Sequence, residues 1–147
     1  MAKGEGDGFR RKTVLVVDDY DGARRITARA LEMFGYRAVE AAGGEEAVEL
    51  ARREMPDLIL MDLSMPNLDG FAAMYSIRRL IGLRDVPFII VSAHTSPEIH
   101  ADALAFGCAD FITKPFELEI LRAAIVRQLE RDDATSESAN RQTDNQT

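Results

Sequence analysis

The feature that most constrains the fold is a set of short, continuous apolar runs separated by longer mixed segments. The runs are Val14–Val17, Leu58–Met61, Phe88–Val91 and the shorter Phe111–Ile112. Continuous apolar runs are typical of strands buried on both faces, because a strand with one solvent-exposed face alternates apolar and polar residues. Residues 36–41 form a weaker, more alternating run, as expected for a strand at a sheet edge. The sequence therefore predicts five strands.

The segments between these runs carry the spacing of amphipathic helices. Apolar residues recur in them at intervals of three and four positions. The stripes are Ala23, Ile26, Ala30, Leu31 and Phe34; Ala47, Val48, Leu50 and Ala51; Phe71, Met74, Ile77 and Ile81; Ile99, Ala103 and Phe106; and Leu118, Leu121, Ile125 and Leu129. Strands that alternate with helices need crossover connections, which place helices on both faces of a parallel sheet. The predicted fold class is α/β, in three layers.

Length, composition and charge limit the other possibilities. A chain of 147 residues with 46% hydrophobic content suits one domain with a real core. The net charge of -7 argues against a nucleic-acid or membrane-surface partner. We find no apolar stretch near the roughly 20 residues that span a bilayer, and no signal peptide, so we expect a cytoplasmic protein. The polar residues 1–11 and 132–147 are predicted to be disordered tails around a domain at 12–131.

Polar side chains follow several of the predicted strands. Asp18 and Asp19 follow the first run, Asp62 and Ser92 follow two others, and Lys114 comes shortly after the last. In an open parallel sheet, ligands bind beyond the carboxyl ends of the strands. Two carboxylates about 4 Å apart repel by roughly 4 kcal/mol at an effective dielectric constant near 20. Three clustered carboxylates therefore predict a divalent cation, and Mg²⁺ prefers such oxygen ligands.

Ser92 and Lys114 indicate a second, anionic ligand. A hydroxyl donor and an ammonium suit a phosphoryl group. If Asp62 is the nucleophile, its carboxylate attacks phosphorus and forms an acyl phosphate. The residues thus predict phosphoryl transfer to Asp62.

The sequence resembles the receiver domain of two-component response regulators over about residues 12–131. The motifs that carry the resemblance are Asp18-Asp19, Asp62 within MDLSMPNLDG, Ser92 within VSA, and Lys114-Pro115-Phe116. The resemblance implies a flavodoxin-like, doubly wound five-stranded sheet in the order 2-1-3-4-5 with five helices. It also implies a Mg²⁺ site, which Mn²⁺ could occupy, formed by Asp18, Asp19, Asp62 and the backbone carbonyl of Ser64.

The resemblance further implies a switch. Ser92 would move toward the phosphoryl oxygens, and Phe111 would swing inward; because Phe111 has no hydroxyl, its two positions differ in packing alone. Lys114-Pro115 resembles the family's cis peptide. The resemblance also places Ser64 and His94 where the family has side chains that tune loss of the phosphoryl group, and plain solvent exposure is about as good an interpretation of both.

Three charged or aromatic features have an ordinary structural interpretation. Arg24 and Arg25 could contact a partner, yet charged helix faces are usually just solvated. His100, on the fourth predicted helix, is expected to be solvated. Phe111 could be a core residue in both states of the switch.

The leading hypothesis is a stand-alone receiver, phosphorylated on Asp62 by a histidine kinase or a histidine phosphotransfer protein. It would catalyse only its own phosphorylation and dephosphorylation, as a monomer or a weak phosphorylation-dependent dimer. The face made by the fourth helix, fifth strand and fifth helix would control a separate output protein, because residues 132–147 are too few and too polar for an output domain.

Two alternatives remain. A phosphatase of the haloacid dehalogenase type also forms an aspartyl phosphate, but it needs an Asp-x-Asp pair, and residues 18–20 read Asp-Asp-Tyr. A degenerate receiver that signals by its fold alone normally lacks an acidic or lysine position of the motif, and all of them are present here.

Overall fold

The computed structural model describes residues 10–64, 69–94 and 96–130. Its elements follow one another as β1 (Thr13–Val17), α1 (Asp21–Met33), β2 (Arg37–Ala41), α2 (Gly44–Glu54), β3 (Leu58–Asp62), α3 (Asp69–Arg78), β4 (Phe88–Ser92), α4 (Pro97–Ala105) and β5 (Asp110–Thr113). A final helix covers residues 118–130. The predicted alternation of five strands with five helices is confirmed.

The predicted tails, 1–11 and 132–147, lie outside the described residues except for positions 10 and 11. Arg11 forms an ion pair with Glu32 of α1 at 2.9 Å, and both side chains are about half exposed. The described part of the chain thus includes the last two positions of the predicted N-terminal tail.

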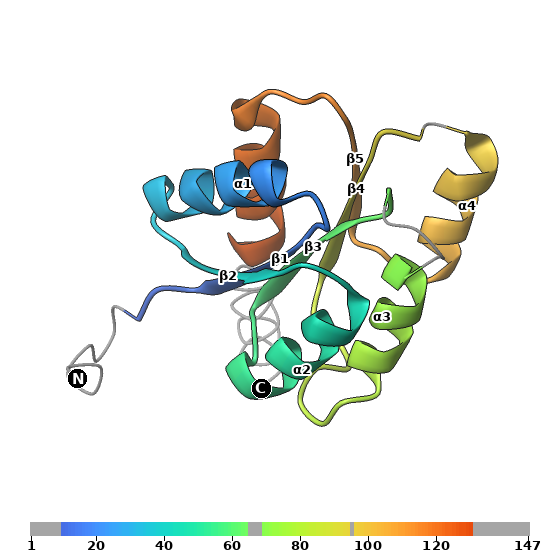
Figure 1. The fold of residues 1–147 in the computed structure, drawn as a ribbon, viewed down its shortest axis with the longest axis horizontal. Coiled ribbons are helices and arrows are strands. Elements are labelled where there is room, and N and C mark those ends of the chain that lie inside the picture. Colours follow the sequence, from blue (N-terminus) through green and yellow to red (C-terminus); the bar gives the residue numbers. More distant parts are fainter. Residues whose placement is uncertain (1–9, 65–68, 95, 131–147) are drawn as a thin grey trace, which may run out of the picture.

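The sheet has the order β2-β1-β3-β4-β5, and each neighbouring pair is parallel. This confirms the predicted flavodoxin-like topology. The strand β2 at one edge is only partly buried, whereas β1, β3 and β4 are buried throughout. Figure 1 shows α2, α3 and α4 on one side of the sheet, with α1 and the final helix on the other.

Two apolar cores lie on the two faces of the sheet. Because successive strand residues point to opposite faces, each central strand contributes to both cores. Leu15 and Met61 pack in the core beneath α2, α3 and α4. Val14 and Leu60 pack in the core beneath α1 and the final helix. The continuous apolar runs are explained by this double burial.

Four residues placed in the apolar helix stripes are exposed, and one of them is Phe106 after the end of α4, at 41%. Ile81 is 96% exposed because α3 ends at Arg78, before the stripe does. Ile26 on α1 is 67% exposed, and Leu118 at the start of the final helix is 46% exposed. The last two line the same surface groove, so their apolar side chains serve a surface and not the core. Among the described helices, none is long and apolar enough to cross a membrane.

Gly70 allows α3 to approach the end of β3. A Cβ atom at this position would lie 2.7 Å from Leu63 Cδ2 and 3.5 Å from the carbonyl oxygen of Asp62. A larger residue would therefore push the first turn of α3 away from the strand that ends at Asp62.

Candidate functional site

The strand register brings distant polar residues to one edge of the sheet. Val17 of β1 is paired with Met61 of β3. Asp18 follows the first of these residues and Asp62 follows the second, so the two aspartates lie at the same edge. Ser92 ends β4, the neighbour of β3, and it is paired with the last residue of β5, which Lys114 follows. The parallel arrangement therefore gathers residues from four strands at one edge.

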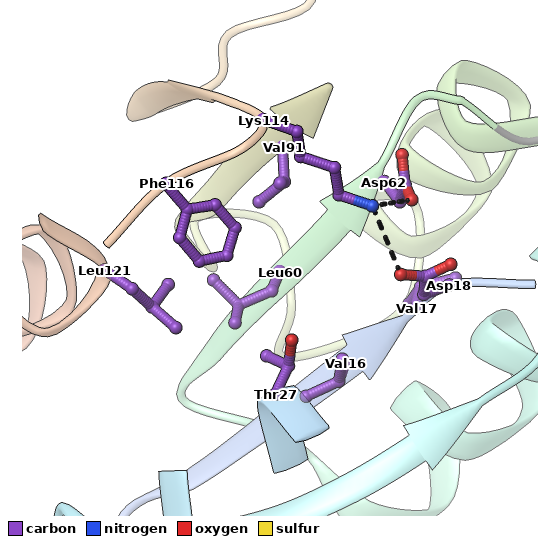
Figure 2. Close-up of a pocket in the computed structure, with 10 residues that line it drawn as sticks. All are labelled: Val16, Val17, Asp18, Thr27, Leu60, Asp62, Val91, Lys114, Phe116 and Leu121. Carbon is purple, nitrogen blue, oxygen red and sulfur yellow. Dashed lines mark hydrogen bonds and ion pairs between the residues drawn. The ribbon is translucent and has the colours of Figure 1, made fainter. Parts of the chain in front are cut away.

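Lys114 joins the two buried carboxylates of this edge. Its Nζ atom lies 2.7 Å from Asp62 Oδ2 and 3.4 Å from Asp18 Oδ2. Asp18 and Asp62 are only 6% and 4% exposed. Figure 2 shows the lysine side chain extended along the strand ends, with its nitrogen between the two carboxylates. The Lys114–Pro115 peptide bond that begins this turn of the chain is cis.

The charges of this cluster are not balanced. Burial raises the pKa of Asp18, and the charge of Asp62 raises it further, against the lowering effects of the Tyr20 N–H group and Lys114. Burial acts to lower the pKa of Lys114, but its hydrogen bond to Asp62 and the two negative charges outweigh burial and raise the pKa. One ammonium thus faces two buried carboxylates, and an additional cation would be attracted there.

The carboxylate of Asp62 is held at both oxygens. Its Oδ1 atom accepts a hydrogen bond of 2.7 Å from the Ser64 N–H group, while Lys114 contacts Oδ2. Ser64 Oγ also accepts a 3.4 Å bond from the N–H group of Ala93, which joins the loops that follow β3 and β4. The orientation of Asp62 therefore depends on two neighbouring strands.

Ser92 is fully buried beside this cluster. Its Oγ atom accepts a hydrogen bond of 3.0 Å from the backbone N–H group of His94. His94 and Ser64 are both exposed. Their exposure agrees with the solvent-exposed interpretation, and a role in tuning the loss of the phosphoryl group stays a prediction.

Asp19 does not join the buried pair. Its side chain is exposed, and within the described ranges the acidic, histidine and cysteine side chains form no group of three that could hold a metal. The sequence predicts a cluster of three carboxylates. The structure has two buried ones, Asp18 and Asp62, and an exposed one, Asp19, next to Asp18 in the sequence. The donors still fit Mg²⁺ or Mn²⁺ in kind, because they are hard oxygen ligands with surplus negative charge.

Phe111 and His100 form a contact that the sequence did not indicate. Their rings stack with centroids 4.6 Å apart and an interplanar angle of 20°. Phe111 is partly buried in β5, and His100 lies on α4. The expectation that His100 is simply solvated is therefore incomplete, because one face of its ring is covered.

Arg24 is the residue at this site that the sequence interpretation missed. It was expected on a solvated or partner-binding helix face with Arg25, and Arg25 is indeed exposed, but Arg24 is buried. Its guanidinium contacts the backbone carbonyl of Asp18 and the carboxylates of Asp21 and Glu40. Two features of the sequence could have suggested this burial: Asp21 lies three positions before Arg24, and Glu40 is the one acidic residue of the edge strand.

Comparisons with known proteins agree with this geometry. The family model of the response regulator receiver domain matches residues 14–126. The chain is 37% identical over 132 residues to the probable transcriptional regulator ycf27 of Porphyridium aerugineum, which covers 90% of this chain and 54% of that protein. The chain spans about half the length of the curated relatives it matches.

Solved structures of receiver domains are also similar. One is the receiver domain of sensor histidine kinase PA1611 from Pseudomonas aeruginosa PAO1, which has magnesium coordinated in its active site cleft. It is 31% identical, with a TM-score of 0.75 over 82% of this chain and 99% of that one. A CheY-like receiver domain protein from Methanospirillum hungatei JF-1 is 25% identical, with a TM-score of 0.79 over 86% and 99%. The chain therefore belongs to the response regulator receiver domain family.

Proposed function

We propose that this receiver accepts a phosphoryl group on Asp62 from a histidine kinase or a histidine phosphotransfer protein. The observation that carries the proposal is the buried Asp62 carboxylate, held at one oxygen by Ser64 and at the other by Lys114 at 2.7 Å. A nucleophile needs such a fixed orientation and a nearby positive charge for the anion it attacks.

The transfer step follows from the positions of these groups. A carboxylate oxygen of Asp62 forms a bond to phosphorus, and the bond from phosphorus to the donor's imidazole nitrogen breaks, with its electron pair going to that nitrogen. Lys114 balances the negative charge of the phosphoryl oxygens. Ser92 Oγ accepts from His94, which does not use the hydroxyl hydrogen, so this hydrogen can be donated to a phosphoryl oxygen.

Asp18, Asp19, Asp62 and the backbone carbonyl of Ser64 would hold Mg²⁺, or Mn²⁺ in its place. When bound, the ion would neutralise charge on the carboxylates and on the phosphoryl oxygens. The surplus negative charge around Lys114 supports this, as does the magnesium in the cleft of the PA1611 receiver. The reaction would be the chain's own phosphorylation and dephosphorylation, with no other substrate turned over.

The output would pass through the face formed by α4, β5 and the final helix. Phe111 already contacts His100 of α4, so a movement of Ser92 and Phe111 would be transmitted to that helix. We expect a separate output protein to read this face, with the receiver acting in the cytoplasm as a monomer or weak phosphorylation-dependent dimer. Control of transcription is a candidate output, because several of the curated relatives are named as transcriptional regulators.

Labelling with acetyl phosphate in the presence of Mg²⁺ tests the proposal. The intact protein should gain the mass of one phosphoryl group, and Asp62→Asn should gain none. Asp57→Asn is the matched control, because Asp57 precedes the same strand at its opposite end and should leave labelling unchanged. Labelling of Asp62→Asn would place the acceptor elsewhere, and steady hydrolysis of small phosphate esters would favour the phosphatase alternative.

A further inference from the structure

Arg24 is a buried arginine whose contacts come from three segments of the chain. Its side chain is 11% exposed. One guanidinium nitrogen, Nη1, lies 3.0 Å from the backbone carbonyl oxygen of Asp18 and 2.8 Å from Asp21 Oδ1. Its Nε atom lies 3.0 Å from Glu40 Oε1 on β2. The side chain therefore connects the start of α1, the end of β1 and the edge strand.

Asp18 is held by hydrogen bonds at both its backbone and its side chain, and Arg24 supplies one of them. The N–H group of Asp18 donates to the carbonyl oxygen of Ala41 at 3.1 Å, and its carbonyl oxygen accepts from Arg24. Its Oδ1 atom accepts from the Tyr20 N–H group at 2.9 Å, and Oδ2 contacts Lys114. Arg24 is the one side chain among these partners that holds the backbone of Asp18, and this backbone leads directly into Asp19.

The electrostatics of the arrangement are unusual for a residue beside a cation site. A guanidinium there would repel a divalent cation, but Asp21 and Glu40 supply two negative charges against its single positive charge. Burial acts to lower the pKa of Arg24, and the hydrogen bonds to Asp21 and Glu40 outweigh burial and raise the pKa. Arg24, Asp21 and Glu40 together thus hold the backbone of Asp18 without adding net positive charge near the carboxylates of the cation site.

We propose that Arg24 is a positioning residue for the cation site. Its hydrogen bond to the carbonyl oxygen of Asp18 would set the affinity with which the carboxylates of this site bind Mg²⁺. The inference rests on the proposed function. It assigns to Arg24 the orientation of Asp18 and Asp19, and no contact with the ion or the phosphoryl group.

Positioning and simple electrostatics predict opposite results. If Arg24 acted only through its charge, Arg24→Met would remove a positive charge near the site, and Mg²⁺ would bind more tightly; Arg24→Lys would bind as the wild type does. If Arg24 acts by positioning, both substitutions weaken binding, because neither side chain can reproduce the forked contacts. A purely architectural role would lower the unfolding temperature of the variants and leave their Mg²⁺ affinity unchanged.

The experiment is a Mg²⁺ titration of the full chain, followed by the backbone amide NMR signals of residues 18 and 19 at a temperature where every variant is folded. We expect Arg24→Met to weaken Mg²⁺ affinity about tenfold, as is typical when the partner of a metal ligand is removed. Arg24→Lys should weaken Mg²⁺ affinity less than Arg24→Met does. Arg25→Met, at an exposed position of the same helix, should have the Mg²⁺ affinity of the wild type. Arg24→Lys conserves the charge, so it serves as the test should Arg24→Met fail to fold.

Wild-type affinity or tighter binding in the folded Arg24 variants would overturn the inference while the proposed function stands. The absence of Mg²⁺ binding by the wild type itself would overturn the proposed function, and the inference with it.

Discussion

The ammonium of Lys114 lies 2.7 Å from a carboxylate oxygen of Asp62, although 52 positions of the chain separate the two residues. The same nitrogen is 3.4 Å from Asp18. The parallel sheet thus places one cation against two buried carboxylates at the edge where β1, β3 and β5 end. The charge on this cluster leads to the following predictions.

Replacing Lys114 with methionine should destabilise the protein most strongly in Mg²⁺-free buffer. The substitution leaves two buried carboxylates without a counter-charge, and breaking a buried pair costs about 3 kcal/mol, here at the lower end because the lysine side chain is 26% exposed. Urea unfolding with and without Mg²⁺ measures the loss, and Mg²⁺ should recover part of it. In an Asp62→Asn background the loss should shrink; an equal loss in both backgrounds would contradict the pairing.

The stability of the protein should depend on pH through Asp18. Its pKa is raised in the folded state by burial and by Asp62, so the folded protein binds this proton more tightly than the unfolded chain does. The stabilisation from the protonated group is complete below the ordinary pKa of 3.8 and is lost as the pH rises through the folded pKa. The unfolding free energy of Asp18→Asn should therefore increase relative to that of the wild type as the pH rises from 3.8 through the folded pKa of Asp18. Urea unfolding across this range checks the sign, and a difference that stays constant or falls with pH would refute it.

Mg²⁺ should stabilise the folded protein, and its removal by a chelator should reverse the effect. A ligand that binds the folded state alone adds about 1.4 kcal/mol at a concentration ten times its dissociation constant. The gain should fade at acidic pH, because protonation of Asp18 competes with the ion. Thermal unfolding with Mg²⁺ or with a chelator measures this, and Asp18→Asn is the control in which the gain should be lost. The same gain in that variant would place the ion elsewhere.

The stacked rings of His100 and Phe111 should be energetically coupled. Aromatic pairs in this geometry contribute about 0.5–1.5 kcal/mol beyond the area they bury. A double-mutant cycle of His100→Ala and Phe111→Leu, measured by urea unfolding, should give a coupling energy near the lower value because His100 is an exposed residue. The same cycle with His94→Ala in place of His100→Ala should give none, and coupling indistinguishable from that control would mean that the stacking contributes nothing.

The fold could be predicted closely because its signal is local and repeated. The runs at Val14–Val17 and Phe88–Val91 are apolar without interruption, which requires burial on both faces, and the structure buries them between two helical layers. The helix stripes were less reliable at their ends. Ile26 and Ile81 fit the helical period but are exposed, because periodicity does not show where the neighbouring layer stops covering a helix.

The site was predicted in part for a similar reason. Asp62 ends one strand and Lys114 follows another, and parallel strands bring their carboxyl ends to one edge, so their meeting could be expected from the sequence. Asp19 also follows a strand, but its side chain is exposed. The direction that a side chain takes after the last strand residue depends on the local turn, and the apolar pattern does not contain this information.

The sequence by itself determined the layers, the strand ends and the residue types at the edge of the sheet, because burial and chain direction follow from short-range patterns. The tertiary structure alone decided that Arg24 is buried against Asp18 and Glu40, and that His100 covers Phe111. Each of these contacts joins side chains from different elements, whose separation is set by how the helices pack on the sheet. No pattern within one segment can report such a distance, and so these contacts became visible only in the folded chain.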